Sequence, residues 1–128
     1  MASVLVSRLL MALEPFFVYS QTLPLRCVQA FLLVAEHPGE SVMDYARRAG
    51  MTHSSMSRNI ADLGRGRLDR TGYGLLSYRE NPSNRSHKQI FLTQSGEALL
   101  FKMTARLKHG EVRKDDRNGK DEVREAVR

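Results

Sequence analysis

The sequence contains few of the residues that build crosslinks and aromatic cores. Its 128 residues include one cysteine, Cys27, and no tryptophan. A single thiol excludes an intrachain disulfide, and a lone free cysteine is typical of a reducing cytoplasm. Because aromatic residues make up only 7% of the chain, we expect a core made mainly of aliphatic side chains and methionine. The composition therefore predicts a cytoplasmic protein that folds without crosslinks.

Long hydrophobic runs are also missing. The apolar residues at the start are interrupted by Arg8 and stopped by Glu14 and Pro15, whereas a helix that spans a bilayer needs about 20 apolar residues. The same segment lacks the basic leader of a secretory signal. We therefore expect neither export nor a membrane partner.

Patterns that would indicate an enzyme or a bound metal are missing as well. No Ser/His/Asp arrangement is apparent, and Asp69 stands where a dinucleotide-binding loop that starts at Gly64 would need its third glycine. The histidines show no metal-ligand spacing; they are His37, His53, His87 and His109. We expect no catalytic residue, no metal and no cofactor.

Positive charge is the main feature that is present, and it is concentrated in the middle of the chain. The formal net charge is +6. Residues 21–109 hold thirteen Lys or Arg and seven Asp or Glu, whereas residues 1–20 and 110–128 are each balanced. An excess of cations in one segment attracts phosphate groups, which favours a nucleic acid as the partner.

The periodicity of apolar residues predicts a mainly α-helical chain with one pair of strands. The expected helices cover residues 3–14, about 24–36, 41–49, 52–63 and 94–109, and the expected strands cover 75–80 and 88–93. Residues 81–87 are rich in turn formers, and the glycine- and arginine-rich residues 64–74 are typical of a loop. Helix, helix, tight turn, helix, hairpin and helix is the order of a winged helix-turn-helix.

The first and last predicted helices are apolar on more than one side. Such helices need a second neighbour, which a second subunit would provide. The predicted organisation is then an N-terminal dimerisation helix, a winged helix-turn-helix DNA-binding domain, a C-terminal dimerisation helix and a charged, disordered tail. These parts cover residues 1–20, 21–93, 94–109 and 110–128.

The stretch "ARRAGMTHSSMSRNIADL", Ala46 to Leu63, carries the helix-turn-helix signal. Gly50 is suited to ending the first helix, Met51 to packing between the helices, and Thr52 to capping the second. Short polar side chains and one cation then occupy the face opposite the apolar residues, as a helix in the major groove requires. The candidate DNA-binding residues here are Thr52, His53, Ser54, Ser55, Ser57, Arg58 and Asn59. The alternative is a plain helical hairpin with a solvated polar face.

From these residues and from "GLLSYRENPSNRSHKQIFLTQSGEALL", the chain resembles the MarR-type winged-helix regulators over roughly residues 24–108. The resemblance implies DNA binding as a homodimer, with the first and last helices at the dimer interface. It also implies that the wing, residues 79–89, meets the minor groove through Arg85 at its tip, with Asn84 and Lys88 beside it. In some members of the family a small molecule controls binding, and the identity of any such effector stays open here.

The chain departs from this family at two places. Asn84 stands where an aspartate often precedes the wing arginine, so a charge that would help to hold Arg85 is absent. Residues 64–74 form an insert between the recognition helix and the first wing strand. Its cations either clamp backbone phosphates or serve as solubilising loop charges; they are Arg65, Arg67 and Arg70. Cys27 is either a packing residue or a redox sensor.

The sequence thus predicts a protein that binds specific sites on double-stranded DNA, a homodimeric transcriptional regulator located with the nucleoid. The recognition helix, residues 52–63, would lie in the major groove and the wing at the minor groove. Two other functions remain open. One is a winged-helix plasmid or phage protein for replication, partition or excision, and the other is a winged-helix adaptor between proteins.

Overall fold

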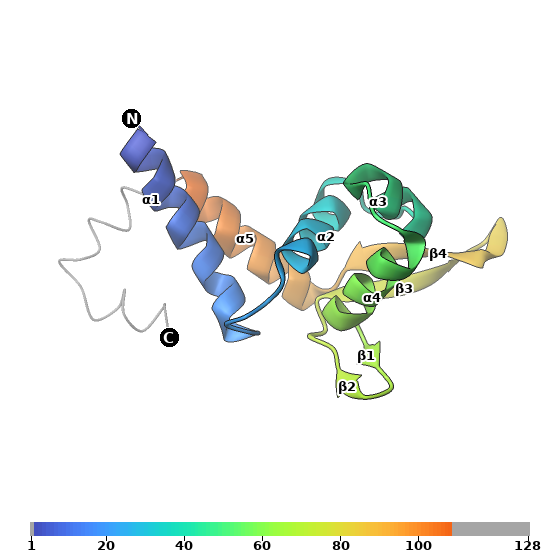
Figure 1. Cartoon of the computed structure of the whole chain (residues 1–128). Helices are drawn as coiled ribbons and strands as arrows, with labels where there is room; N and C mark the ends of the chain where they lie inside the picture. The colour runs from blue at the N-terminus through green and yellow to red at the C-terminus, as the bar shows by residue number, and fades with distance from the viewer. Residues whose placement is uncertain (1, 109–128) are drawn as a thin grey trace. The chain divides into compact units, whose positions relative to one another are not determined.

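A computed structural model describes residues 2–108, apart from the side chains of Ala2, Arg85 and Ser86. The predicted tail lies outside the described residues. The described residues divide into two compact units, one of residues 24–97 and one of residues 2–23 together with 98–108. The elements are α1 (Ala2–Leu13), the 3-10 helix η1 (Glu14–Val18), α2 (Leu25–Glu36), α3 (Val42–Ala49), α4 (His53–Leu63), β1 (Gly66–Arg67), β2 (Arg70–Thr71), β3 (Leu76–Asn81), β4 (Asn84–Leu92) and α5 (Gln94–Lys108) (Figure 1).

The helix boundaries of the unit Pro24–Glu97 follow from the capping residues. The Ser41 hydroxyl accepts from the Asp44 amide while the Asp44 carboxylate accepts from the Ser41 amide, which completes a capping box at the start of α3. Gly50 ends α3 at a φ of 66°, a conformation that other residues adopt at a cost. The Thr52 hydroxyl accepts from the Ser55 amide and so caps α4. The predicted helix-turn-helix is confirmed, although Met51 is only half-buried.

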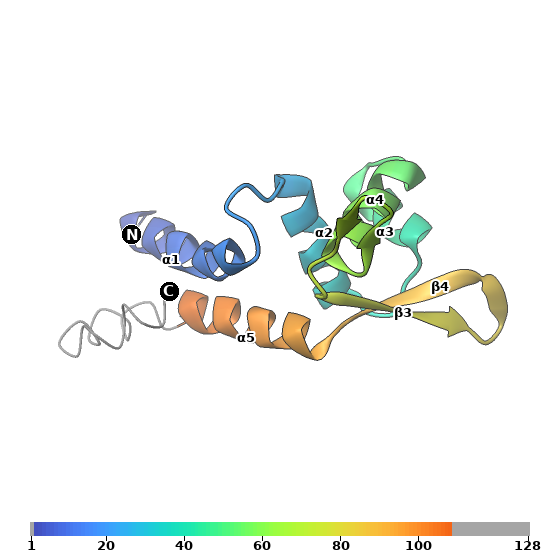
Figure 2. The same ribbon diagram turned by 90° about the horizontal axis from the view of Figure 1, so that it is seen from below.

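The wing is an antiparallel pair of strands, β3 and β4, with Leu76 opposite Leu92 and Tyr78 opposite Ile90. The segment between α2 and α3 pairs with β4 on its other side. The Gly39 amide donates to the Ile90 carbonyl, and the Ile90 amide donates to the Glu40 carbonyl. The predicted turn is present but shorter than residues 81–87, since it is confined to Pro82 and Ser83 and β4 already begins at Asn84. The outer arm (Figure 2) is polar on both faces and therefore lacks the alternation that would reveal a strand.

The insert is not the irregular loop that we predicted. Its two short strands pair antiparallel, with Gly66 opposite Thr71 and Arg67 opposite Arg70. Strands of two residues bury too little to leave an apolar pattern, so the sequence gives no periodic signal for them.

The core of this unit lies between α2, α3, α4 and the inner ends of β3 and β4. Tyr45 and Phe31 are the largest fully buried side chains. The expected aliphatic and methionine core is therefore only partly correct, because Met56 is buried beside two aromatic rings. The Tyr45 hydroxyl donates to the carbonyl of His37 and accepts from the Glu40 amide, so it ties α3 to the preceding turn.

The other unit contains α1, η1 and most of α5, and α1 and α5 run side by side in both ribbon views (Figures 1 and 2). Among its described residues, the buried side chains are Ala12, Pro15, Phe16, Leu99 and Met103. The Arg106 guanidinium donates to the Met11 carbonyl and to the Glu14 carboxylate, at 2.9 and 3.2 Å. In the described part of the chain, no helix combines the length and the apolar character that crossing a membrane requires.

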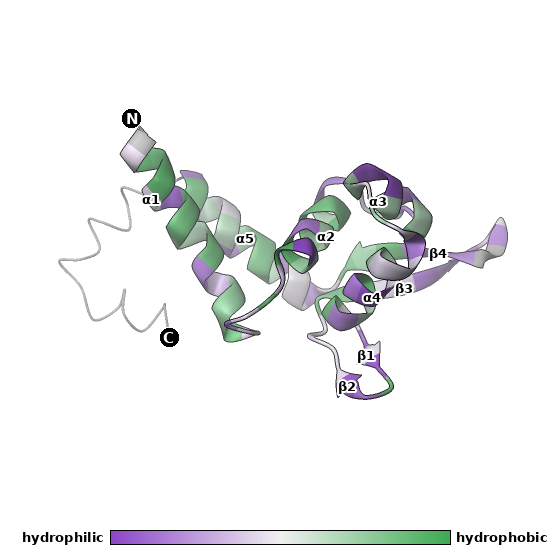
Figure 3. Cartoon of the chain, in the orientation of Figure 1, coloured by the Kyte–Doolittle hydropathy of each residue, from purple (hydrophilic) through white to green (hydrophobic). Residues whose placement is uncertain are grey.

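This unit leaves much apolar surface uncovered. Figure 3 shows α1 as hydrophobic along most of its length. The exposed apolar side chains of α1, η1 and α5 include Val4, Leu5, Val6, Leu9, Leu10, Leu13, Phe17, Val18, Phe101 and Leu107. A folded monomer seldom exposes a large contiguous apolar surface.

Candidate nucleic-acid interface

One face of α4 is exposed and polar while the opposite face is fully buried. Met56, Ile60 and Leu63 point into the core, with 0–2% of their surface exposed. Ser54 and Arg58 are exposed and lie four residues apart, one turn above the other on the same side. They form what we call the exposed stripe of α4. The stripe offers a hydroxyl and a guanidinium at the spacing of successive helical turns.

Of the other predicted residues of α4, His53 is exposed, whereas three are less available. Ser55, Ser57 and Asn59 are half-buried. The carbonyl oxygen of the Asn59 side chain accepts from the Cys27 thiol at 3.4 Å, so Asn59 faces α2. The Thr52 hydroxyl is occupied by its cap, at 3.1 Å from the Ser55 amide. The polar face that could read DNA is therefore narrower than predicted.

The environment of Cys27 determines the reactivity of its thiol. The side chain is buried, and this burial, reinforced by the charge of Asp62 and opposed by Arg67, raises the pKa of the thiol to about 11. Oxidation and alkylation proceed through the thiolate. A protonated, buried thiol agrees with the packing role and not with a redox sensor.

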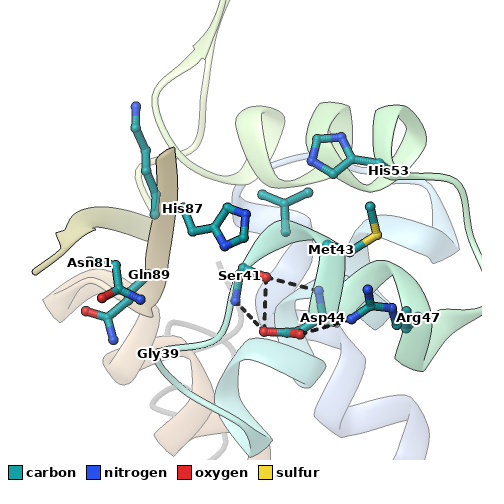
Figure 4. A pocket seen from close by; sticks show the side chains of 11 residues that line it. Gly39, Ser41, Met43, Asp44, Arg47, His53, Asn81, His87 and Gln89 are labelled. Carbon is teal, nitrogen blue, oxygen red and sulfur yellow. Dashed lines mark hydrogen bonds and ion pairs between the residues drawn. The ribbon is translucent and has the colours of Figure 1, made fainter. Parts of the chain in front are cut away.

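A groove of about 470 Å³ lies between the start of α3, the start of α4 and the wing. Figure 4 shows that Arg47, His53 and His87 border it. The Asp44 carboxylate within it is bound to the Ser41 amide and hydroxyl and lies 3.5 Å from Arg47. Hydrogen bonds from Ser41 hold the pKa of Asp44 below its ordinary value, so this acid stays charged.

A second ion pair fixes the start of α3. Two guanidinium nitrogens of Arg48 lie 2.7 and 2.8 Å from the Glu40 carboxylate oxygens. Hydrogen bonding to Arg48 lowers the pKa of Glu40. Since Arg48 is engaged in this pair, Arg47 is the cation of α3 that borders the groove.

The wing places its predicted residues at the exposed end of β4. Asn84 and Lys88 are exposed, and the Asn84 amide nitrogen lies 3.5 Å from Nδ1 of His87. Arg85 lies in β4, but its side chain is outside the described residues, so its role stays a prediction. Arg79 stacks on the Phe91 ring, with 4.4 Å between the guanidinium carbon and the ring centroid.

The three arginines of the insert have different environments. Nε and Nη2 of Arg67 lie 2.9 and 3.3 Å from the two carboxylate oxygens of Asp62. The Arg65 guanidinium lies over the Tyr78 ring, at 5.4 Å from its centroid. Arg70 is exposed, with only a 4.0 Å contact to Asp69. Arg67 is thus a structural residue, whereas Arg65 and Arg70 remain accessible.

Sequence reasoning missed Asp62, Arg47 and His87. Asp62 follows Arg58 by four residues and is the one acidic residue of α4. An acid at this spacing in a basic segment could have been recognised from the sequence as a partner for a nearby arginine. The position of Arg47 and His87 in the groove depends on how the wing packs beside the helices. No local sequence pattern gives this.

Solved structures share this fold. The Thermotoga maritima transcriptional regulator Tm0710 aligns with a TM-score of 0.69 at 12% identity, over 98% of this chain and 82% of its own. A transcriptional repressor named CouR, bound to a 23-mer DNA duplex, aligns with a TM-score of 0.58 at 19% identity, over 95% of this chain and 80% of its own. The regulator PcaV of Streptomyces coelicolor, in complex with its natural ligand, aligns with a TM-score of 0.56 at 19% identity, over 70% of this chain and 58% of its own.

These structures are of MarR-family transcriptional regulators, so the predicted MarR-type winged-helix fold is confirmed. The match to PcaV spans less than two thirds of the length of that protein. No protein-family profile matches this sequence, and a comparison with curated protein sequences finds no match.

Proposed function

We propose that the protein binds specific sites on double-stranded DNA and regulates transcription as a homodimer. The observation that carries the proposal is the exposed stripe of α4. Ser54 and Arg58 stand on a helix whose opposite face is anchored by Met56, Ile60 and Leu63. An anchored helix with short polar side chains can enter the major groove, and an arginine there can pair with a guanine.

Charge supports the same partner. The formal net charge is +6. Arg47 on α3 and Lys88 on the wing line the groove beside the start of α4, and Arg70 on the insert is exposed beyond its end. Each can neutralise a backbone phosphate. The DNA-bound CouR structure has the same fold, which is consistent with this use of the surface.

The homodimer is supported by the uncovered apolar surface of α1, η1 and α5. A second copy would bring an identical surface, and a two-fold interface pairs such surfaces with each other. It would also present two recognition helices to a palindromic site. Dimerisation and DNA reading are then parts of one function.

Binding of the unmodified protein to a random duplex library, at several salt concentrations, tests this function. We expect a small set of related, two-fold symmetric sequences to be enriched, with affinity that falls steeply as salt rises. An adaptor between proteins would show no such binding. The genomic positions of the enriched sites, at promoters or at origins and attachment sites, separate a transcriptional role from replication or excision.

A further inference from the structure

The insert between α4 and β3, residues 64–74, is a hairpin with a defined conformation. A Cβ at Gly66 would stand 2.3 Å from the Gly72 amide nitrogen, and a Cβ at Gly72 would stand 2.2 Å from the Gly64 carbonyl oxygen. Real Cβ contacts are never so close, so the two ends of the hairpin meet where only glycine fits. The Gly72 amide donates to the Arg65 carbonyl at 3.1 Å and the Gly74 amide to the Gly64 carbonyl at 2.9 Å. These bonds close the base of the hairpin.

The hairpin is also tied to the recognition helix. Arg67 holds the Asp62 side chain through two hydrogen bonds, and the Tyr73 amide donates to the Asp62 carbonyl at 3.0 Å. The Leu75 amide donates to the Leu63 carbonyl at 2.7 Å. Bonds from both arms of the hairpin thus converge on the last turn of α4, and this fixes the direction in which the hairpin projects.

The hairpin starts beside the exposed stripe of α4. Asp62 follows Ser54 and Arg58 at intervals of four residues, but it is half-buried and lies at the edge of the stripe, near enough to Cys27 for its charge to raise the pKa of that thiol. The wing borders the other end of this helix, where His53 and His87 line one groove. In Figure 1 the two hairpins, β1–β2 and β3–β4, project in different directions, with α4 between them.

The pairing of Asp62 removes an electrostatic conflict. A bare carboxylate beside the exposed stripe would repel the phosphates of a bound duplex. Arg67 pairs with it, and the Asp62 side chain is 17% exposed. Arg65 and Arg70 remain accessible beyond the pair, and Leu68 is fully exposed at the tip.

We propose that residues 64–74 form a second wing that grips DNA beyond the end of the recognition helix. Arg65 and Arg70 contact backbone phosphates, and Leu68 packs against the deoxyriboses of the adjoining minor groove. Asp62 and Arg67 are positioning residues that hold the hairpin against the duplex. This inference rests on the proposed function, because it assigns the insert to the same DNA.

The first test removes one proposed phosphate contact of the insert and leaves the recognition helix unchanged. Arg70→Ala lowers affinity about three- to tenfold and makes the slope of log K against log salt shallower by about 0.9, because one phosphate contact is lost. The ranking of duplex sequences stays the same. Lys102→Ala, an exposed cation on α5, is the control with the same change in charge, and we expect no change in slope.

The second test uses the sign of a charge change. Asp62→Asn makes the protein more positive, so simple electrostatics predicts tighter binding. If the Asp62–Arg67 pair positions the hairpin, this variant binds DNA more weakly and loses backbone protection at the outer ends of the footprint. Arg67→Gln has the same effect, and the double variant is no weaker than either single one because both changes remove one interaction. Thermal unfolding of all variants confirms that they fold.

The outcomes separate this inference from the proposed function. If Arg58→Ala changes the sequence preference while Arg70→Ala and Leu68→Ser leave affinity, salt slope and footprint unchanged, the second wing is wrong and the reading helix is not. Tighter binding by Asp62→Asn also overturns the second wing. If Leu68→Ser instead changes the oligomeric state, the tip is a protein contact. An unmodified protein that binds no duplex overturns both proposals.

Discussion

At the scale of single residues, Cys27 shows how burial determines reactivity. Its thiol has a pKa of about 11, so at pH 7 only about one molecule in ten thousand carries the reactive thiolate. We expect iodoacetamide to modify the folded protein very slowly and the unfolded protein at the ordinary rate of a free cysteine. Mass spectrometry of the alkylated chain, with and without urea, measures both rates. Rapid modification of the folded protein would restore the redox-sensor interpretation.

The hydroxyl group of Tyr45 stabilises the turn that precedes α3. The ring is fully buried, and the hydroxyl donates to the His37 carbonyl and accepts from the Glu40 amide. Tyr45→Phe keeps the ring and leaves these two backbone groups without that partner. The free energy of unfolding should fall by about 1–3 kcal/mol. Urea unfolding measures this, and an unchanged midpoint would mean that water replaces the hydroxyl without loss.

At the scale of elements, α3 depends on carboxylates that stay charged. Hydrogen bonds from Ser41 lower the pKa of Asp44, and Arg48 lowers that of Glu40. Groups with a lowered folded pKa stabilise the fold above their unfolded pKa of about 4, and this contribution is lost as pH falls through the folded values. We expect stability to fall below pH about 4, and Asp44→Asn with Glu40→Gln to reduce that dependence. Urea midpoints at several pH values measure it.

Most element boundaries could be predicted because single residues determine them. Pro24 precedes α2, Ser41 and Thr52 cap α3 and α4, and Gly50 adopts the left-handed conformation of the turn. The outer arm of β4 could not be predicted, because Asn84 to Lys88 are polar on both faces and make their bonds through the backbone.

The candidate site was predictable in composition but not in detail. The exposed stripe of α4 follows from helical spacing, and Ser54 and Arg58 are exposed as expected. Asn59 is polar like these two residues, yet it follows the buried Met56 by three positions and faces Cys27 on another helix. The pairing of Arg67 with Asp62 depends on how the glycines fold the insert back onto α4. Such contacts depend on packing, which a linear pattern does not encode.

At the scale of the whole molecule, the exposed apolar surface predicts a dimer. Leu9 and Phe101 are both exposed, so Leu9→Asp with Phe101→Asp should yield a folded monomer that binds DNA weakly. Leu99 is unsuitable for this test, because it is buried and a charge there would unfold the unit. Lys102→Ala provides a surface control on the same helix. Sedimentation measures the mass, and an unmodified protein that is monomeric at tens of micromolar would contradict the dimer.

The central claim is that α4 reads DNA, and the sequence preference of Arg58→Ala tests it most directly. The unmodified protein, Arg58→Ala and Lys102→Ala are each bound to the same duplex library at matched salt. We expect Arg58→Ala to change the ranking of duplexes, with a loss of about 1–3 kcal/mol at the position of one base pair. We expect Lys102→Ala to keep the original ranking. An unchanged ranking for Arg58→Ala, with only a uniform loss of affinity, would contradict the claim that the exposed stripe of α4 reads base edges.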